Sequence, residues 1–528
     1  MNTSKINQEK EEFFKIELSD KRQRWRPDLG LPMRPADKLF AEILKPAGRY
    51  RGPLPFGDIL LLRLYHKIAT LCGFGAAVFP EDTTPVPLNW QTIVQYLFEA
   101  GIIKEPKVDF EISFNDEPKL YLLRLWATSV SGLTDGGADL MGGGYNRGVS
   151  ADLDEAISKA IGELLERYPL ALYRDSELVR ASVADLKRSK AHFLDPFFVA
   201  GYSDFQKKEF SNRRFDDRSI FRWAEGASLM SGGKALIPAQ MVFWNYLFDK
   251  SEPFLQQPIT SGAGGMFTLT EAILSGLHEL VQRDGFFIYW LNKIAPPRIN
   301  HSSIKSPELL DLLEALRRYG LRVEILDVTS DLGIPAFASI IIDGDGAPAI
   351  AMGAGCGFDP EAAILRAVTE AIGVRHWLRA IAETSGYFSL PTPYKPFSVR
   401  LGQKERLLLW GNPNMRENLD FFLDGPIGSI EKRHPAPEVF SSPEEELRHM
   451  VNIFKKKGER YEIFFFEAKH PVLEKLGYKS VRVSVPALIP LYLNELAAPL
   501  GAERRVDACG LLGYNPAKEI NDLPHPFP

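Results

Sequence analysis

Apolar and polar residues follow a helical period in three long segments of the chain. These segments span residues 150–172, 268–291 and 359–378. In each of them apolar residues return every three or four positions, which is typical of a helix with one buried face. Each segment opens with a residue type that caps helices: Ser150, Thr268 or Thr270, and Asp359 followed by Pro360. The pattern therefore predicts three long helices in the middle of the chain.

Shorter apolar runs lie around these helices and are rich in β-branched and aromatic residues. Such runs predict strands over residues 118–130, 321–329, 336–344, 460–468 and 479–488. Further helical patterns occupy residues 58–77, 89–103 and 441–458. The mixture predicts an α/β (α+β) fold in which helices cover the sheets.

Changes in composition divide the chain. The first 55 residues are charged and rich in proline, so we expect an irregular arm there. With the helical pattern that follows, it forms an N-terminal accessory region over residues 1–130, ahead of a domain over 131–528. The glycine-rich stretch 134–148 is expected to turn the chain, and the proline-rich stretch 391–400 to act as a linker or boundary.

Composition excludes several classes of protein. The chain has 528 residues, 45% of them hydrophobic and 25% charged, which is typical of a globular protein. A net charge of -5 gives no electrostatic case for nucleic-acid binding. Three scattered cysteines indicate neither a disulfide framework nor a cysteine-based zinc site. The polar N-terminus and the lack of a long apolar run predict a cytoplasmic protein without a membrane segment.

Glutamate and arginine interrupt the apolar pattern of all three long helices. In the first helix Glu163, Glu166 and Arg167 fall on one face; in the second, Glu271, Ser275, Glu279 and Gln282 do, with Arg283 beside them; in the third, Arg366 and Glu370 are one turn apart and Arg375 points away. One explanation of this pattern is that the stripes face solvent and contain ordinary ion pairs between residues four positions apart. If the stripes face one another, their carboxylates can hold Mg²⁺ and their arginines can bind phosphates.

The usual nucleotide-binding loops are absent from the sequence. In SLMSGGKA, Ser228 stands where a P-loop has its first glycine, and Ala235 stands where Ser or Thr follows the lysine. In GAGCGF, Phe358 replaces the last glycine of GxGxxG, and Cys356 is expected to be a packing residue. Neither HExxH nor GxSxG occurs. A nucleotide, if bound, requires another kind of site.

Four blocks of sequence resemble the YcaO superfamily, in the order in which that family has them. The blocks are GGGYNRGVSADLDEAISKAIGELLERY, SGAGGMFTLTEAILSGLHELVQRD, GCGFDPEAAILRAVTEAIGVRHW and VRVSVPAL. The resemblance covers residues from about 140 to 490. It implies the YcaO fold and an ATP site without a P-loop, in which helix-borne glutamates coordinate Mg²⁺.

The resemblance also implies roles for individual residues. The metal ligands would be Glu163, Glu166, Glu271, Glu279, Gln282 and Glu370. The residues that bind ATP would be Arg147, Ser158, Lys159, Arg167, Ser275, Arg283, Arg366 and Arg375. The chain departs from the family pattern at several of these positions: Lys159 stands where a serine is expected, Ser275 and Gly373 replace common glutamines, and Gln282 replaces a glutamate.

The last residues, DLPHPFP, resemble the proline-rich tail of YcaO proteins that form azolines in ribosomal peptides. Alternating proline favours an extended chain, which could carry the terminal carboxylate of Pro528 into the site as a base or an orienting group. The alternatives are a disordered end or a docking peptide.

The resemblance predicts an ATP-dependent cyclodehydratase that converts Cys, Ser or Thr to thiazoline or oxazoline. A thioamide- or amidine-forming enzyme and a non-catalytic scaffold remain alternatives.

The same resemblance implies partners. Because about 125 residues are too few for the partner domain that such enzymes often carry, we expect a separate E1-like, leader-binding protein to present the precursor peptide. A flavin-dependent azoline dehydrogenase could act later. A homodimer within a larger complex is the expected assembly.

Overall fold

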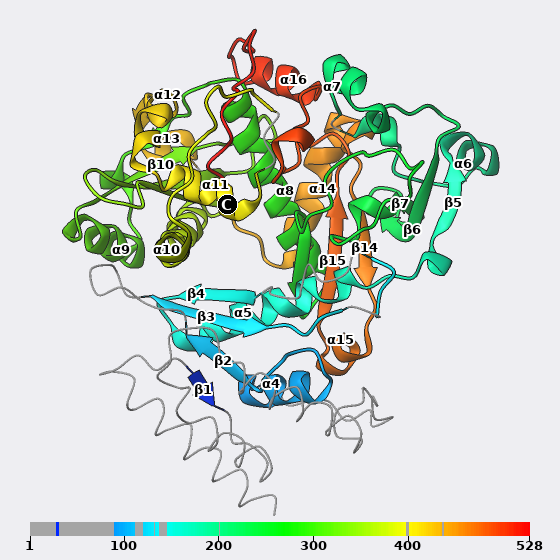
Figure 1. The fold of residues 1–528 in the computed structure, drawn as a ribbon, viewed down its shortest axis with the longest axis horizontal. Helices are drawn as coiled ribbons and strands as arrows, with labels where there is room; N and C mark the ends of the chain where they lie inside the picture. The colour runs from blue at the N-terminus through cyan, green and yellow to red at the C-terminus, as the bar shows by residue number, and fades with distance from the viewer. Residues whose placement is uncertain are drawn as a thin grey trace, which may run out of the picture.

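The computed structural model describes residues 28–30, 89–110, 120–130, 133–136, 145–199, 201–397, 401–435 and 438–528. Within these residues the strands form three sheets, against which the helices pack (Figure 1). The mixed α and β fold expected from the sequence is confirmed. The helix expected over 58–77 and most of the N-terminal arm lie outside the described residues, and the boundary near residue 130 stays a prediction.

The sheets are antiparallel apart from one parallel pair between β9 and β13. The first sheet has the order β1 (Asp28–Gly30), β2 (Lys107–Phe110), β3 (Tyr121–Trp126) and β4 (Tyr145–Ser150). The second has the order β12 (Ile350–Cys356), β11 (Ala336–Asp343), β10 (Leu321–Asp327), β9 (Arg298–Ile299) and β13 (Ile427–Gly428). The third has the order β5 (Val179–Ser182), β6 (Ile220–Ser228), β14 (Phe464–Ala468), β15 (Lys479–Ser484) and β8 (Ala263–Met266), with β7 (Lys234–Pro238) beside β6.

An edge strand of each sheet leads directly into one of the three long helices. Strand β4 precedes α5 (Leu153–Arg167), β8 precedes α8 (Leu269–Leu291) and β12 precedes α10 (Pro360–Ser385). Thr268 and Asp359 cap α8 and α10 as expected. The cap of α5 is Asp152 instead of Ser150, whose hydroxyl donates to Glu155. The glycine-rich stretches before α8 and α10 are largely strands β8 and β12.

A glycine on each edge strand lets its helix lie directly against the backbone. A Cβ atom at Gly148, Gly264 or Gly355 would come within 2.0 Å of a carbonyl oxygen eight residues further on, at Ala156, Ala272 and Ala363 respectively. Each helix also contacts the edge strand of another unit: α5 contacts β8, α8 contacts β12, and α10 contacts β4. The three strand–helix units therefore close into a ring.

The remaining helices surround this ring. They include α4 (Trp90–Glu99), α6 (Val183–Ser189), α7 (Asp204–Glu209), α9 (Pro307–Arg318), α11 (Gln403–Trp410), α12 (Asp420–Leu423), α13 (Ile430–Arg433), α14 (Pro443–Lys457), α15 (Pro471–Leu476) and α16 (Arg504–Leu511). The largest hydrophobic core joins α8 to α11, α14, α16 and the end of the chain. Leu401 and Leu409 belong to this same core, so the stretch 391–400 does not separate two cores. No described helix is long and apolar enough to cross a membrane.

Candidate functional site

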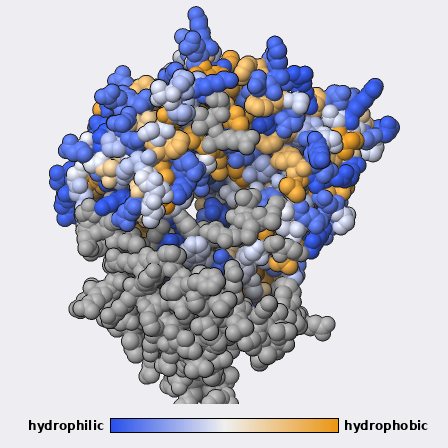
Figure 2. Space-filling view, in the orientation of Figure 1, coloured by the Kyte–Doolittle hydropathy of each residue, from blue (hydrophilic) through white to orange (hydrophobic). Residues whose placement is uncertain are grey.

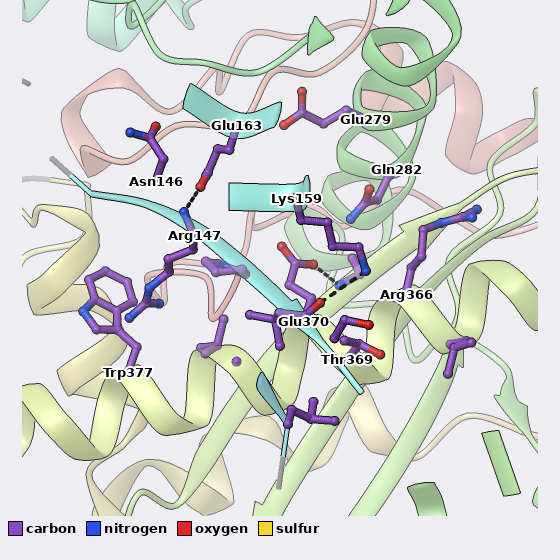
Figure 3. Close-up of a pocket in the computed structure, with 18 of the residues that line it drawn as sticks. Asn146, Arg147, Lys159, Glu163, Glu279, Gln282, Arg366, Thr369, Glu370 and Trp377 are labelled. Carbon is purple, nitrogen blue, oxygen red and sulfur yellow. Dashed lines mark hydrogen bonds between the residues drawn. The ribbon is translucent and has the colours of Figure 1, made fainter. Parts of the chain in front are cut away.

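A cavity of about 1860 Å³ lies inside the ring of strand–helix units. Its walls include residues of α5, α8, α9 and α10, of β4 and β12, and residues 257–260, 491, 493 and 528. A hollow opens in the middle of the face shown in Figure 2, and hydrophilic residues are visible inside it. Figure 3 shows side chains from all three long helices turned toward this space.

One glutamate of each long helix occupies the same place in its unit. Glu163, Glu279 and Glu370 each lie fifteen residues after the closely packed glycine and line the cavity. Each accepts a hydrogen bond from a backbone N–H of its own unit. The donors are the N–H groups of Arg147, Gly262 (2.6 Å) and Ala354 (2.7 Å), respectively. The repeated contact fixes three carboxylates around one space (Figure 3).

An arginine accompanies two of these glutamates but not the third. Arg167 pairs with Glu163 at 2.6 Å, and Arg283 pairs with Glu279 at 2.5 Å, in each case one helical turn later. The matching position on α10 is Val374. Among the described residues, no cation forms an ion pair with Glu370. The third unit therefore presents its carboxylate to the cavity without a paired arginine.

Arg375, the next residue on α10, points away from the cavity. Its side chain is buried, donates to the carbonyl oxygen of Pro348 at 2.6 Å, and pairs with Asp343 at 2.9 Å. The structure thus does not bring Arg375 to the other predicted ATP-binding residues. Helical geometry had already left it off the polar face.

The other predicted residues divide into two groups. Arg147, Lys159, Gln282 and Arg366 line the cavity. Ser158, Glu166, Ser275 and Glu271 lie outside its lining. Glu271 instead accepts a hydrogen bond from the hydroxyl of Thr268 (2.6 Å) in the first turn of α8. Glu271 therefore belongs to the polar stripe because it bonds to the residue that caps α8, and not because it faces the cavity.

Burial dominates the electrostatics beside the cavity. It raises the pKa of Glu166 to about 8, and the charge of Glu279 adds to this rise. It also raises the pKa of Glu370, although the Ala354 N–H opposes the change. Arg482 on β15 is buried nearby, and desolvation lowers its pKa to about 10 while Glu279 opposes this. A bound cation would favour ionisation of these carboxyl groups.

Several lining residues carried no signal in the sequence. Asn146, Thr369 and Trp377 lie beside the predicted residues in Figure 3. The Arg147 guanidinium lies 4.5 Å from the centre of the Trp377 ring. Because Arg147 is on β4 and Trp377 is on α10, only the closed ring brings them together.

The oxygen-rich lining fits Mg²⁺ better than a soft metal, because Mg²⁺ prefers carboxylate, phosphate and water oxygens. Within the described ranges, no group of three His, Cys, Asp or Glu side chains is close enough to hold a metal ion. Mg²⁺ commonly binds through one or two carboxylates and completes its coordination with phosphate and water oxygens.

The proline-rich end of the chain is packed into the fold. Phe527 is 1% exposed, the indole N–H of Trp410 donates to the carbonyl of Pro524 at 2.9 Å, and Pro528 lines the cavity. The letter C in Figure 1 marks this end in the middle of the molecule. The alternative of a disordered end is therefore wrong for these residues.

Comparison with known proteins gives a family. The model of the YcaO family, described as a cyclodehydratase that binds ATP and Mg²⁺, matches residues 147–489. This protein belongs to the YcaO family. The match begins in β4 and includes the three strand–helix units, so the ring that forms the cavity is part of the family domain.

Solved structures share the fold, and the chain spans little more than half the length of a curated relative that it matches. A heterocyclase in complex with substrate and cofactor has a TM-score of 0.67 and 22% identity, over 87% of this chain and 60% of that protein. YcaO from Methanopyrus kandleri, bound with AMPPCP and Mg²⁺, has a TM-score of 0.52 and 20% identity, over 78% and 94%. An uncharacterized protein in the tfuA 3′ region of Rhizobium leguminosarum bv. trifolii is 29% identical over 46% of this chain and 57% of its own length. The structural likenesses show the shared fold.

Proposed function

We propose that this YcaO protein is the ATP-dependent cyclodehydratase component that forms thiazoline or oxazoline rings in a ribosomal precursor peptide. The observation that carries the proposal is the cavity, where three helix-borne glutamates and Pro528 line the same space. The family's description as an ATP- and Mg²⁺-binding cyclodehydratase supports it.

The charged wall of the cavity is proposed to hold Mg²⁺·ATP. Glu163, Glu279, Glu370 and the Gln282 amide would supply oxygen ligands, with Glu166 behind them. Arg167, Arg283 and Arg366 would contact phosphates, and Arg147 and Lys159 would contact the nucleotide from the β4 side. Bound Mg²⁺ would neutralise charge that develops on the transferred phosphoryl group.

In the proposed reaction a Cys, Ser or Thr side chain of the peptide attacks the preceding amide carbonyl and loses its proton. The resulting oxyanion attacks the γ-phosphorus of ATP, and ADP leaves. The C–O bond then breaks with loss of phosphate, and the amide nitrogen gives up its proton as the C=N bond forms. Each ring therefore consumes one ATP and removes the elements of one water. The enzyme's task is largely positioning and charge stabilisation.

Pro528 is proposed to supply the base. Its main-chain carboxylate would accept a proton from the peptide, because Pro528 reaches the same cavity as the charged helices. Phe527 and Pro524 hold the segment on either side of His525, so little ordering is needed when substrate binds.

We further propose a separate E1-like protein that delivers the leader peptide, a later flavin-dependent dehydrogenase and a homodimeric assembly.

The test is incubation of the protein with Mg·ATP, its precursor peptide and the leader-binding partner, followed by mass spectrometry. We expect loss of one water for each ADP formed. Exchange of oxygen for sulfur would instead indicate thioamide formation. Failure to bind Mg·ATP, together with unchanged pathway output for Glu163→Ala and Glu279→Ala, would indicate a scaffold.

A further inference from the structure

A buried ion pair lies behind the cavity wall that adjoins Pro528. Arg406 on α11 and Glu495 are both fully buried, and their Nη1 and Oε1 atoms are 2.9 Å apart. A second guanidinium nitrogen of Arg406 donates to the carbonyl of Leu493. Leu491 and Leu493 line the cavity, whereas Arg406 and Glu495 do not. The pair therefore contacts a residue of the cavity wall without lining the cavity itself.

Two further polar contacts extend from this pair. The Gln257 side-chain oxygen accepts from the N–H groups of Leu493 (2.8 Å) and Asn494 (3.0 Å). The carbonyl of Tyr492, between the two lining leucines, lies 2.7 Å from Nε2 of His525 in the tail. Because a carbonyl only accepts, Nε2 must carry the proton in this contact. His525 is fully buried, and burial followed by the charge of Arg406 lowers its pKa well below the usual value.

The tail also contacts α8, which forms part of the charged wall of the cavity. The His525 ring packs edge-on against Phe287 and Tyr492, with centroid distances of 4.9 and 4.7 Å. Phe527 packs against Phe286 (5.0 Å), and the Arg283 guanidinium lies 5.5 Å from the centre of the Phe527 ring. A continuous set of contacts thus runs from Arg406 to the arginine that pairs with Glu279.

We propose that Arg406 and Glu495 are positioning residues: their buried ion pair holds segment 491–495, which holds His525 and thereby fixes Phe527 and Pro528 at the cavity. This inference rests on the proposed function for its catalytic consequence. The positional part concerns the protein alone. Replacing a buried ion pair by apolar residues is often neutral for stability, so a pair kept for position can be separated from a pair kept for stability.

The chain contains a matched control. Arg222 and Glu252 form another buried ion pair at 3.1 Å, and each side chain is 3% exposed. Arg222 also lies over a tyrosine ring, that of Tyr246, as Arg406 lies near Tyr492. Arg222 is on β6 and Glu252 lies outside the strands, and neither residue lines the cavity. Its loss should cost stability without moving the tail.

The experiment compares Arg406→Met, the double variant Arg406→Met with Glu495→Leu, Arg406→Lys and Arg222→Met in the full chain. The first readout is hydrogen exchange at the backbone amides of residues 521–523, 525 and 527, which are the tail residues with an N–H group. Faster tail exchange is expected in Arg406→Met and in the double variant, with α5 and α8 unchanged, partial recovery in Arg406→Lys, and no change in Arg222→Met. Unchanged tail exchange in the double variant, or equal acceleration in Arg222→Met, would overturn the proposal.

The second readout is turnover with peptide. We expect kcat for dehydration to fall about tenfold or more in the double variant, while KM for ATP stays within about twofold. A parallel loss of ATP binding would overturn the positioning role. If the wild-type protein dehydrates no peptide, the proposed function fails, but the exchange result still decides whether the ion pair positions the tail.

Discussion

The two walls of the cavity are built in different ways. One wall is charged and comes from α5, α8 and α10, where each glutamate is fixed by a backbone N–H of its own strand–helix unit. The other wall, near Pro528, presents Leu491, Leu493 and Pro258 and depends on contacts between distant segments. The first wall carries charge on rigid local units, and the second sets position through long-range packing.

From this difference we expect substitutions in the two walls to have different effects. A substitution in the charged wall should lower turnover without changing the fold, because the glutamate acts at the cavity surface. A change behind the uncharged wall should displace the tail and leave Mg·ATP binding. Kinetics and structural probes can therefore be assigned to one wall or the other.

The largest effect is expected for Glu163→Gln. The amide keeps an oxygen that accepts from the Arg147 N–H but removes the charge opposite Arg167 and the proposed metal ligand. We expect turnover to fall on the order of 10²- to 10³-fold, as for loss of one preorganised electrostatic group. The measurement is peptide-dependent phosphate release.

Glu271→Gln is the control for this prediction. Glu271 is on a polar stripe too, but it bonds to the capping residue Thr268 at the start of α8, outside the cavity lining. Its replacement should leave turnover within a few-fold. Equal losses for both variants would contradict the assignment of the charged wall to residues that line the cavity.

The next effect is expected for Phe527→Ala. Removal of the ring deletes its contacts with Phe286 and the Arg283 guanidinium, and the tail loses its fixed position. We expect kcat to fall by up to about 100-fold, because small displacements of reacting groups can cost this much. Calorimetry should show nearly unchanged affinity for Mg·ATP.

A buried phenylalanine elsewhere provides the comparison. Phe221 on β6 is fully buried in a different core cluster. Phe221→Ala should lower the unfolding midpoint at least as much as Phe527→Ala, yet keep kcat. Full turnover by Phe527→Ala would show that the tail wall has no role in the reaction.

The two walls also differ in how far the sequence predicts them. The positions of Glu163, Glu279 and Glu370 follow from helical period, because the features that orient them lie within one strand–helix unit. The closed ring does not follow, since it depends on contacts such as α5 with β8. The strands β8 and β12 were not predicted, and their glycines allow close packing against a helix.

Apart from the prolines of the tail, the sequence contains almost no pattern that predicts the uncharged wall near Pro528. Arg406, Glu495 and His525 lie far apart in the chain, and no spacing or motif in the sequence links them. Only the folded structure shows that they meet. The resemblance to the YcaO family drew attention to Pro528, but it carried no information about the residues that hold it.

A smaller effect is expected from pH. The pKa of His525 is lower in the folded protein than in the unfolded chain, where it is near 6.5. The folded state therefore binds fewer protons, and its stability is present above pH 6.5 and lost as pH falls below it. We expect His525→Gln to reduce this acid sensitivity by up to about 1.4 kcal/mol per pH unit, measured as unfolding free energy between pH 7.5 and 5.5.

His470 is the control for the pH experiment, because burial lowers its pKa too while its side chain lies beside Tyr168, away from the tail. His470→Gln should also flatten the stability profile but leave tail exchange unchanged. An identical pH profile for wild type and His525→Gln would contradict the neutral, buried state of His525.

The smallest effect is expected at the rim of the charged wall, for Lys159→Met. Lys159 pairs with Glu155 at 2.8 Å, but the two side chains are 45% and 55% exposed, so the pair should contribute less than about 1 kcal/mol to stability. Its proposed contact with the nucleotide should appear only as a few-fold rise in KM for ATP, and this rise should diminish at high salt because exposed charges are screened. A loss of turnover as large as that of Glu163→Gln would place Lys159 among the groups that act on the reacting phosphate, and the charged wall would then extend along α5 to the rim of the cavity.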